Sequence, residues 1–109
     1  MDIDNETQER IQELQSLEQT LHPLMMQKQA FQMELNETDN ALSEIVKADD
    51  EVFKIIGQIM IKSSKENIKE DLEKKQKLVS LRLEAIEKQE SALTEKAGKL
   101  REEVMKQIK

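Results

Sequence analysis

The side chains that could do acid–base, nucleophilic or metal chemistry do not gather anywhere in this sequence. His22 is the single histidine, and neither cysteines nor a nearby carboxylate cluster accompany it to form a metal site or a catalytic base. The 23 acidic residues are spread over stretches of helical character, where charges are usually solvated. The sequence also lacks a cysteine nucleophile and a glycine-rich phosphate loop. We therefore predict no enzyme, no metal site and no cofactor, and we expect His22 to face solvent.

The composition favours long helices over a compact core. Charged residues make up 37% of the chain and aromatic residues 2%, and a chain rich in Glu, Lys, Leu and Gln is typical of coiled coils. Disorder is the competing interpretation of so polar a chain, but the regular apolar spacing described next argues against it. No apolar run approaches about 18 residues, so no membrane span is expected. The absence of cysteine is compatible with a reducing cytosol, and we expect a cytoplasmic protein.

Two stretches of the chain place apolar residues at alternating spacings of three and four. Residues that oppose each other in an antiparallel pair of helices keep a nearly constant sum of residue numbers. That sum is 117 for Ile45 with Leu72 and 118 for Leu14 with Val104. The heptad period predicts an antiparallel coiled coil of two helices, about 4–48 and about 65–108, folded back through the segment between them. The two seams are Leu14, Leu17, Leu21, Leu24, Lys28, Phe31, Leu35, Thr38, Leu42 and Ile45, and Leu72, Gln76, Val79, Leu83, Ile86, Glu90, Leu93, Ala97, Leu100 and Val104.

The two halves carry opposite net charge. Residues 1–51 have a net charge of −10 and residues 52–109 a net charge of +4. This complementarity favours pairing between the predicted helices. The basic residues of the second half are interleaved with acidic ones and have no aromatic residues for base stacking, so we expect no nucleic-acid partner.

Pro23 interrupts the first predicted helix. Proline inside a helix removes a backbone donor and costs about 3 kcal/mol. The heptad phase nevertheless runs through it from Leu21 to Leu24, and Pro23 falls on the solvent face. We expect a kink there, and a helix boundary at Pro23 is the alternative.

Between the helices, the run "VFKIIGQIMIK" predicts a β-hairpin over about 52–62. Strand-favouring residues flank Gly57, and a glycine at the first central position suits a type II′ turn. Ile56 then faces Ile59, and Phe53 faces Lys62. Ser63 with Glu66 has the spacing of a capping box for the second helix, and Ser64 is an equally good cap.

Both faces of this hairpin are largely apolar. A two-stranded hairpin is marginal in water, and its outer edges expose unpaired backbone groups. Because the two helices bury their apolar seams against each other, we expect other subunits to bury the hairpin. The alternative is a short connector that caps its own coiled coil. The predicted oligomer interface consists of Val52, Phe53, Ile55, Ile56, Gly57, Ile59, Met60 and Ile61.

The segment "DDEVFKIIGQIMIKSSKENIKEDLEKK", residues 49–75, with its coiled-coil flanks, resembles the beta-type subunit of the archaeal prefoldin family. Alpha-type subunits of that family carry two hairpins, and only one is visible here. The resemblance implies a single prefoldin-like domain over 1–109 whose hairpin joins a β-barrel hub in a hexamer of two alpha and four beta subunits. It further implies a holding chaperone, independent of ATP, that binds unfolded polypeptides and passes them to a group II chaperonin.

The two chain ends supply the predicted client-binding tips. Helix ends fray easily, and we expect fraying to expose apolar groups to a non-native chain. Ordinary seam packing is the alternative for these residues, and a scaffold or adaptor coiled coil without chaperone activity is the alternative for the whole chain. The predicted tip residues are Ile3, Ile11, Leu14, Leu17, Leu100, Val104, Met105 and Ile108.

Overall fold

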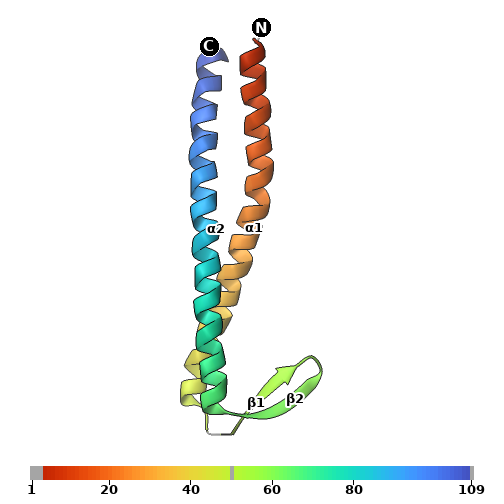
Figure 1. The fold of residues 1–109 in the computed structure, drawn as a ribbon, viewed down its shortest axis with the longest axis vertical. Coiled ribbons are helices and arrows are strands. Elements are labelled where there is room, and N and C mark those ends of the chain that lie inside the picture. The colour runs from red at the N-terminus through yellow and green to blue at the C-terminus, as the bar shows by residue number, and fades with distance from the viewer. Residues whose placement is uncertain (1–3, 50, 109) are drawn as a thin grey trace. The chain divides into compact units, whose positions relative to one another are not determined.

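The chain folds as two helices joined by one antiparallel hairpin, in a computed structural model that describes residues 4–49 and 51–108 (Figure 1). Helix α1 spans Asn5–Lys47, strand β1 spans Glu51–Ile56, strand β2 spans Ile59–Ser64 and helix α2 spans Lys65–Ile108. The predicted fold class is confirmed. Within the described residues, no helix is long and apolar enough to cross a bilayer.

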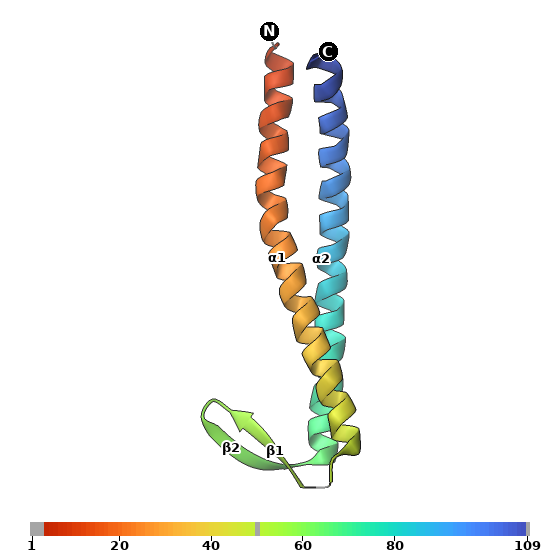
Figure 2. The same cartoon turned by 180° about the vertical axis from the view of Figure 1, so that it is seen from behind.

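The chain divides into two compact units, and each contains a part of both helices. Residues 30–83 form the hairpin unit, and residues 1–29 with 84–109 form the terminal unit. In each unit the segments of α1 and α2 lie side by side and run in opposite directions, as seen from the front and from behind (Figures 1 and 2).

The seam predicted from the heptads is where the helices are buried. All twenty seam positions are buried or half-buried, and Val79 and Ala97 are among the least exposed residues. Helix α1 continues through Pro23, so a helix boundary there is wrong. Pro23 and His22 are both exposed, as predicted. Pro23 therefore lacks its backbone N–H donor on the solvent face of α1, and the seam on the opposite face is not disturbed.

Two polar interruptions of the seams meet each other in the terminal unit. Lys28 Nζ donates a hydrogen bond to Glu90 Oε1 at 3.1 Å, and both side chains are half-buried. Their residue numbers sum to 118, as expected for opposing seam positions. In the hairpin unit, Gln76 Nε2 donates to Asp39 Oδ1 at 2.6 Å. Lys28, Gln76 and Glu90 thus find partners on the other helix, whereas the hydroxyl of Thr38 donates to the Glu34 carbonyl oxygen of its own helix at 2.8 Å.

Ion pairs between the helices follow the charge asymmetry of the sequence. Of the five pairs found within the described residues, three place the acid on α1 and the base on α2, in the sense of the predicted complementarity, and Lys28–Glu90 is reversed. The other four lie at the surface, so each contributes about 0.2–1 kcal/mol. The pairs are Lys96–Glu13 at 3.3 Å, Arg101–Glu18 at 3.3 Å, Lys75–Glu34 at 3.7 Å and, in the opposite sense, Arg10–Glu103 at 3.1 Å.

Side-chain caps start both helices. The Thr7 amide donates to Asp4 Oδ1 at 2.7 Å, and Thr7 lowers the pKa of Asp4, first through its side chain and then through this amide. The Asn67 amide donates to Ser64 Oγ at 3.1 Å. Ser64 is therefore the N-cap of α2, three residues before its bonded amide, and Ser63 is not.

Lys65 ties the end of α1 to the start of α2. Its Nζ donates to the carbonyl oxygens of Val46 and Ala48 at 3.2 and 3.0 Å. The last carbonyls of a helix have no partner within the helix and carry partial negative charge, so a cation there is stabilising. The contact anchors both ends of the hairpin to the same point of the hairpin unit.

Candidate interaction surfaces

The hairpin has the turn and register that its sequence predicts. Ile56 pairs with Ile59, Ile55 with Met60, Lys54 with Ile61 and Phe53 with Lys62. Gly57 has φ +61°, and among the described residues no other residue has a positive φ. A positive φ at the first central position alone is the type II′ geometry.

Six large apolar side chains of the hairpin lie in solvent. Ile55 is 70% exposed, Met60 65% and Ile59 64%. Because successive side chains point to opposite faces of a strand, these residues belong to both faces. Both strands also keep one free edge, since the sheet has two strands. The exposed set is Phe53, Ile55, Ile56, Ile59, Met60 and Ile61.

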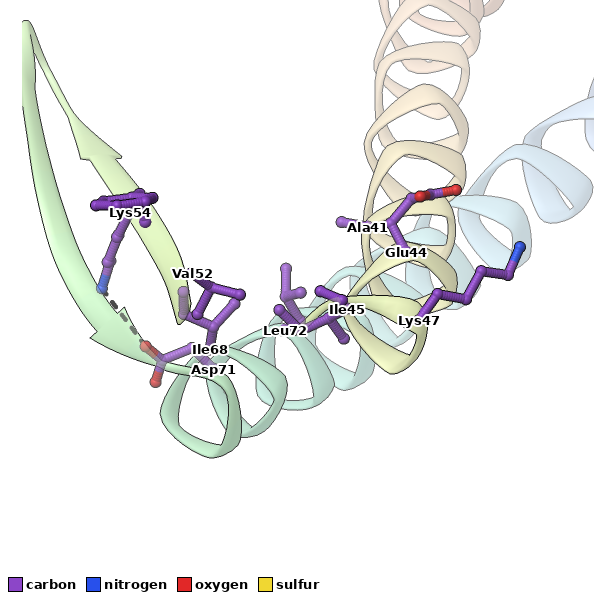
Figure 3. Close-up of a pocket in the computed structure, with 11 residues that line it drawn as sticks. Ala41, Glu44, Ile45, Lys47, Val52, Lys54, Ile68, Asp71 and Leu72 are labelled. Atoms are coloured by element: carbon purple, nitrogen blue, oxygen red, sulfur yellow. Dashed lines mark hydrogen bonds and ion pairs between the residues drawn. The ribbon is translucent and has the colours of Figure 1, made fainter. Parts of the chain in front are cut away.

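Val52 differs from the other predicted interface residues because it is buried within its own unit. It is 9% exposed and lies between the hairpin and the helices, near Ile68 and Leu72 (Figure 3). Gly57 is exposed at the turn. In both views the turn points away from the helices of the hairpin unit (Figures 1 and 2). The free hairpin therefore presents its outer part to solvent and keeps its base packed.

An apolar cavity of about 580 Å³ lies at the base of the hairpin, and we call it the joint pocket. Charged side chains of Glu44, Lys47, Lys54 and Asp71 also border it, and Lys54 Nζ lies 3.4 Å from Asp71 Oδ2 (Figure 3). The remaining walls come from α1, the residue that follows it, β1 and α2, and are Ala41, Ile45, Ala48, Val52, Phe53, Ile68 and Leu72.

The predicted tip residues are mostly seam residues in the structure. Met105 is 56% exposed, whereas Val104 is buried. Ile3 lies outside the described residues. The others are half-buried. These half-buried residues are Ile11, Leu14, Leu17, Leu100 and Ile108.

Sequence reasoning missed six exposed apolar residues on the helices. They lie outside the seams, at heptad positions that usually face solvent. An apolar residue at such a position is the sequence signal that could have identified them. Leu78 and Leu81 are three residues apart on one face of α2. The set is Met25, Met26, Met33 and Val46 on α1, with Leu78 and Leu81 on α2. A short apolar patch also occurs on ordinary surfaces, so this set assigns no function by itself.

Known proteins of one family are similar to this chain in sequence and fold. A family model described as "Prefoldin subunit" matches residues 8–109. The prefoldin subunit beta of Pyrococcus furiosus is 33% identical over 104 residues, which cover 94% of this chain and 89% of that protein. The prefoldin subunit beta of Pyrobaculum calidifontis is 34% identical over 90 residues, covering 81% and 72%. The crystal structure of the prefoldin beta subunit from Thermococcus strain KS-1 matches with a TM-score of 0.90 and 33% identity, covering 96% of this chain and 94% of that one.

Proposed function

Because this chain belongs to the prefoldin family, a family of chaperones and not of enzymes, we propose that it is the beta-type subunit of a holding chaperone. Four copies would assemble with two alpha-type subunits through their hairpins. The helix ends would hold unfolded polypeptides in the cytoplasm without ATP and pass them to a group II chaperonin. The observation that carries the proposal is the apolar hairpin, which the described chain leaves exposed.

The energetics of the hairpin support assembly. Burying one large apolar side chain contributes about 1.5–3 kcal/mol before ordering costs. Six such side chains lie in solvent on a single hairpin, and its two free edges add backbone donors and acceptors. Neighbouring strands can satisfy both groups at once, because strand addition pairs the edge and buries the alternate side chains. A scaffold coiled coil has no need for such a surface.

The burial of the tip residues supports weak and reversible client binding. Apart from the exposed Met105, an apolar tip residue becomes fully available to a client only when it leaves the seam, so part of the contact free energy is lost in opening the helix end. Weak contacts still give strong holding when several arms act together, because each further contact is intramolecular. A client can then be released by losing one contact at a time.

The assembly can be tested by co-expression with an alpha-type prefoldin subunit, followed by native mass measurement and an aggregation assay without ATP. We expect a six-subunit species that suppresses aggregation of an unfolded client. A plain scaffold would give no such species and no suppression. Transfer of the held client to a group II chaperonin is expected as recovery of native client when the chaperonin and ATP are added.

The location of client binding can be tested with matched exposed residues on α2. Met105 is 56% exposed near the chain end, and Leu81 is 63% exposed in the hairpin unit. We expect Met105→Ser to weaken client holding and Leu81→Ser to leave it unchanged, with both hexamers intact. Removing residues 1–10 and 101–109 should abolish holding. Full holding by the truncated hexamer would rule out the tips as the client site.

A further inference from the structure

Lys28 and Glu90 place two charges inside an otherwise apolar stretch of the seam. Lys28 Nζ lies 3.1 Å from Glu90 Oε1, and the two side chains are only 30% and 22% exposed. Among the ion pairs between the helices of the described chain, this is the one that joins two seam positions. The preceding and following seam residues are apolar on both helices, namely Leu24 and Phe31 on α1 and Ile86 and Leu93 on α2.

The pair is poorly suited to stabilise the seam. Glu90 Oε2 is buried and has no hydrogen-bond partner within the described part of the chain. A buried acceptor without a partner is destabilising, and apolar residues that replace a buried ion pair often keep or raise the stability. A single polar position in an apolar seam instead specifies how the helices align, at a cost in stability. The pair therefore matters for alignment, meaning which residues of α1 lie level with which residues of α2.

Apolar packing alone does not distinguish the observed alignment from its neighbours. A slide of one helix by half a heptad, about 5 Å, or by a whole heptad, about 10 Å, again matches seam residues with seam residues. Each such slide separates Lys28 from Glu90 and leaves two half-buried charges without partners. Lys28 would then lie level with Ile86, Leu93, Leu83 or Ala97, and Glu90 with Leu24, Phe31, Leu21 or Leu35.

The other polar contacts between and within the helices depend less on alignment. The hydroxyl of Thr38 donates to a carbonyl oxygen of its own helix, so a slide does not break that bond. Gln76 and Asp39 meet at the surface, where water replaces a lost partner. Lys65 joins the helices at the hairpin end, within the hairpin unit. In the terminal unit, the Lys28–Glu90 pair is thus the half-buried polar contact that a slide would break.

We propose that Lys28 and Glu90 form an alignment lock, which holds α1 and α2 of the terminal unit in one axial position because every slide leaves both charges without partners. The inference goes beyond the proposed function and does not rest on it, since it concerns pairing within one copy. The lock would keep apolar groups near the two helix ends, such as Leu14 and Val104, at the same level.

The distance between two spin labels in the full-length chain, measured by pulsed electron paramagnetic resonance, tests the lock. Gln12→Cys and Ser91→Cys carry the labels, because both residues are exposed in the terminal unit and the sequence has no cysteine of its own. The constant sum of residue numbers places Gln12 level with Lys106, far along α2 from Ser91, so the distance follows an axial slide. Dilution with unlabelled chain restricts the measurement to distances within one copy.

Two double variants separate alignment from stability. Lys28→Leu with Glu90→Leu keeps the seam apolar without the pair, and Lys28→Glu with Glu90→Lys keeps the pair with its charges exchanged. Arg10→Leu with Glu103→Leu is the matched control. That pair has the same sense, with the base on α1 and the acid on α2, and lies in the same unit but at the surface.

We expect one distance in the wild-type chain, in the charge-exchanged variant and in the control. The leucine variant should show a second distance, displaced by about 5 or 10 Å. The fraction of slid molecules should rise on the order of 10- to 100-fold, the factor that corresponds to an unpaired buried polar group.

Three results would overturn the proposal. A single, unchanged distance in a helical leucine variant would show that apolar packing suffices for alignment. A second distance of equal weight in the charge-exchanged variant would show that the pairing of the charges is irrelevant. Loss of helix in the leucine variant, seen by circular dichroism, would show that the pair serves stability instead.

Discussion

Gly98 should lower the local stability of α2 and so raise the equilibrium constant for opening of its C-terminal end. It lies inside α2, and among the described residues only Gly57 has a positive φ, so no left-handed conformation requires glycine at this position. Apart from its chain neighbours and the adjacent backbone of its own helix, a Cβ added to Gly98 would have no heavy atom within 4 Å. Neither backbone geometry nor packing therefore explains the glycine, and Gly98→Ala should fit without strain.

The expected magnitude follows from helix propensity. Glycine inside a helix is less stable than alanine by about 0.5–1 kcal/mol. Gly98→Ala should therefore lower the equilibrium constant for opening of the surrounding helix by about two- to fivefold. Ala92→Gly, at an exposed position of the same helix and unit, should raise it by a similar factor.

Hydrogen exchange of the backbone amides of residues 95–108, measured by mass spectrometry in the hexamer, reports this opening. Client holding by each variant is measured in parallel. If clients bind to opened helix ends, Gly98→Ala should slow exchange and weaken holding, and Ala92→Gly should do the reverse.

Two results would refute the reasoning. Unchanged or faster exchange in Gly98→Ala would show that the glycine does not weaken α2. Slower exchange with unchanged holding would show that clients bind without opening of the helix end, and Met105 would then be the exposed contact to examine.

Three further predictions concern the fold. Lys28→Leu should lower the free energy of unfolding by about 1–3 kcal/mol in urea titrations, because it leaves the half-buried Glu90 carboxylate without its partner. Adding Glu90→Leu should recover that loss. A loss that persists in the double variant would contradict this explanation. Ser64→Ala should lower the free energy of unfolding by about 0.5–2 kcal/mol, because it removes the N-cap of α2. Hydrogen exchange of the Asn67 amide should become faster, and unchanged exchange would contradict the capping role. Gly57→Ala should lower the stability of the hairpin by about 1–2 kcal/mol, because an alanine is strained at the φ of +61° found there. The variant should also assemble less in native mass measurements. Undiminished assembly would count against the turn geometry.

The seam and the hairpin register were predictable because both follow from short periodic patterns. The seven-residue repeat places the seam residues from Leu14 to Ile45 on one face of the first helix. The constant sum of residue numbers already predicts that Lys28 lies opposite Glu90, as the ion pair between them shows. The strand register follows from Gly57 alone, since a two-residue turn leaves one alignment.

Other features depend on how separate segments meet, and the sequence does not contain that angle. Ser63 and Ser64 offer the same hydroxyl, and the cap is decided by where the chain leaves β2. The joint pocket exists because the hairpin departs from the helices at a particular inclination, which leaves Val52 buried and Ile55 free. The ragged ends of the heptads likewise did not reveal that Met105 alone is exposed among the predicted tip residues that the structure describes.

The central claim is that the exposed hairpin is covered by other subunits. Sedimentation equilibrium at micromolar concentration, of the wild-type chain with an alpha-type prefoldin subunit, tests it most directly. The mixture should contain one six-subunit species, and Ile55→Ser together with Ile59→Ser should dissociate it. A wild-type chain that sediments at its single-copy mass of 12.7 kDa in the presence of that partner would contradict the claim.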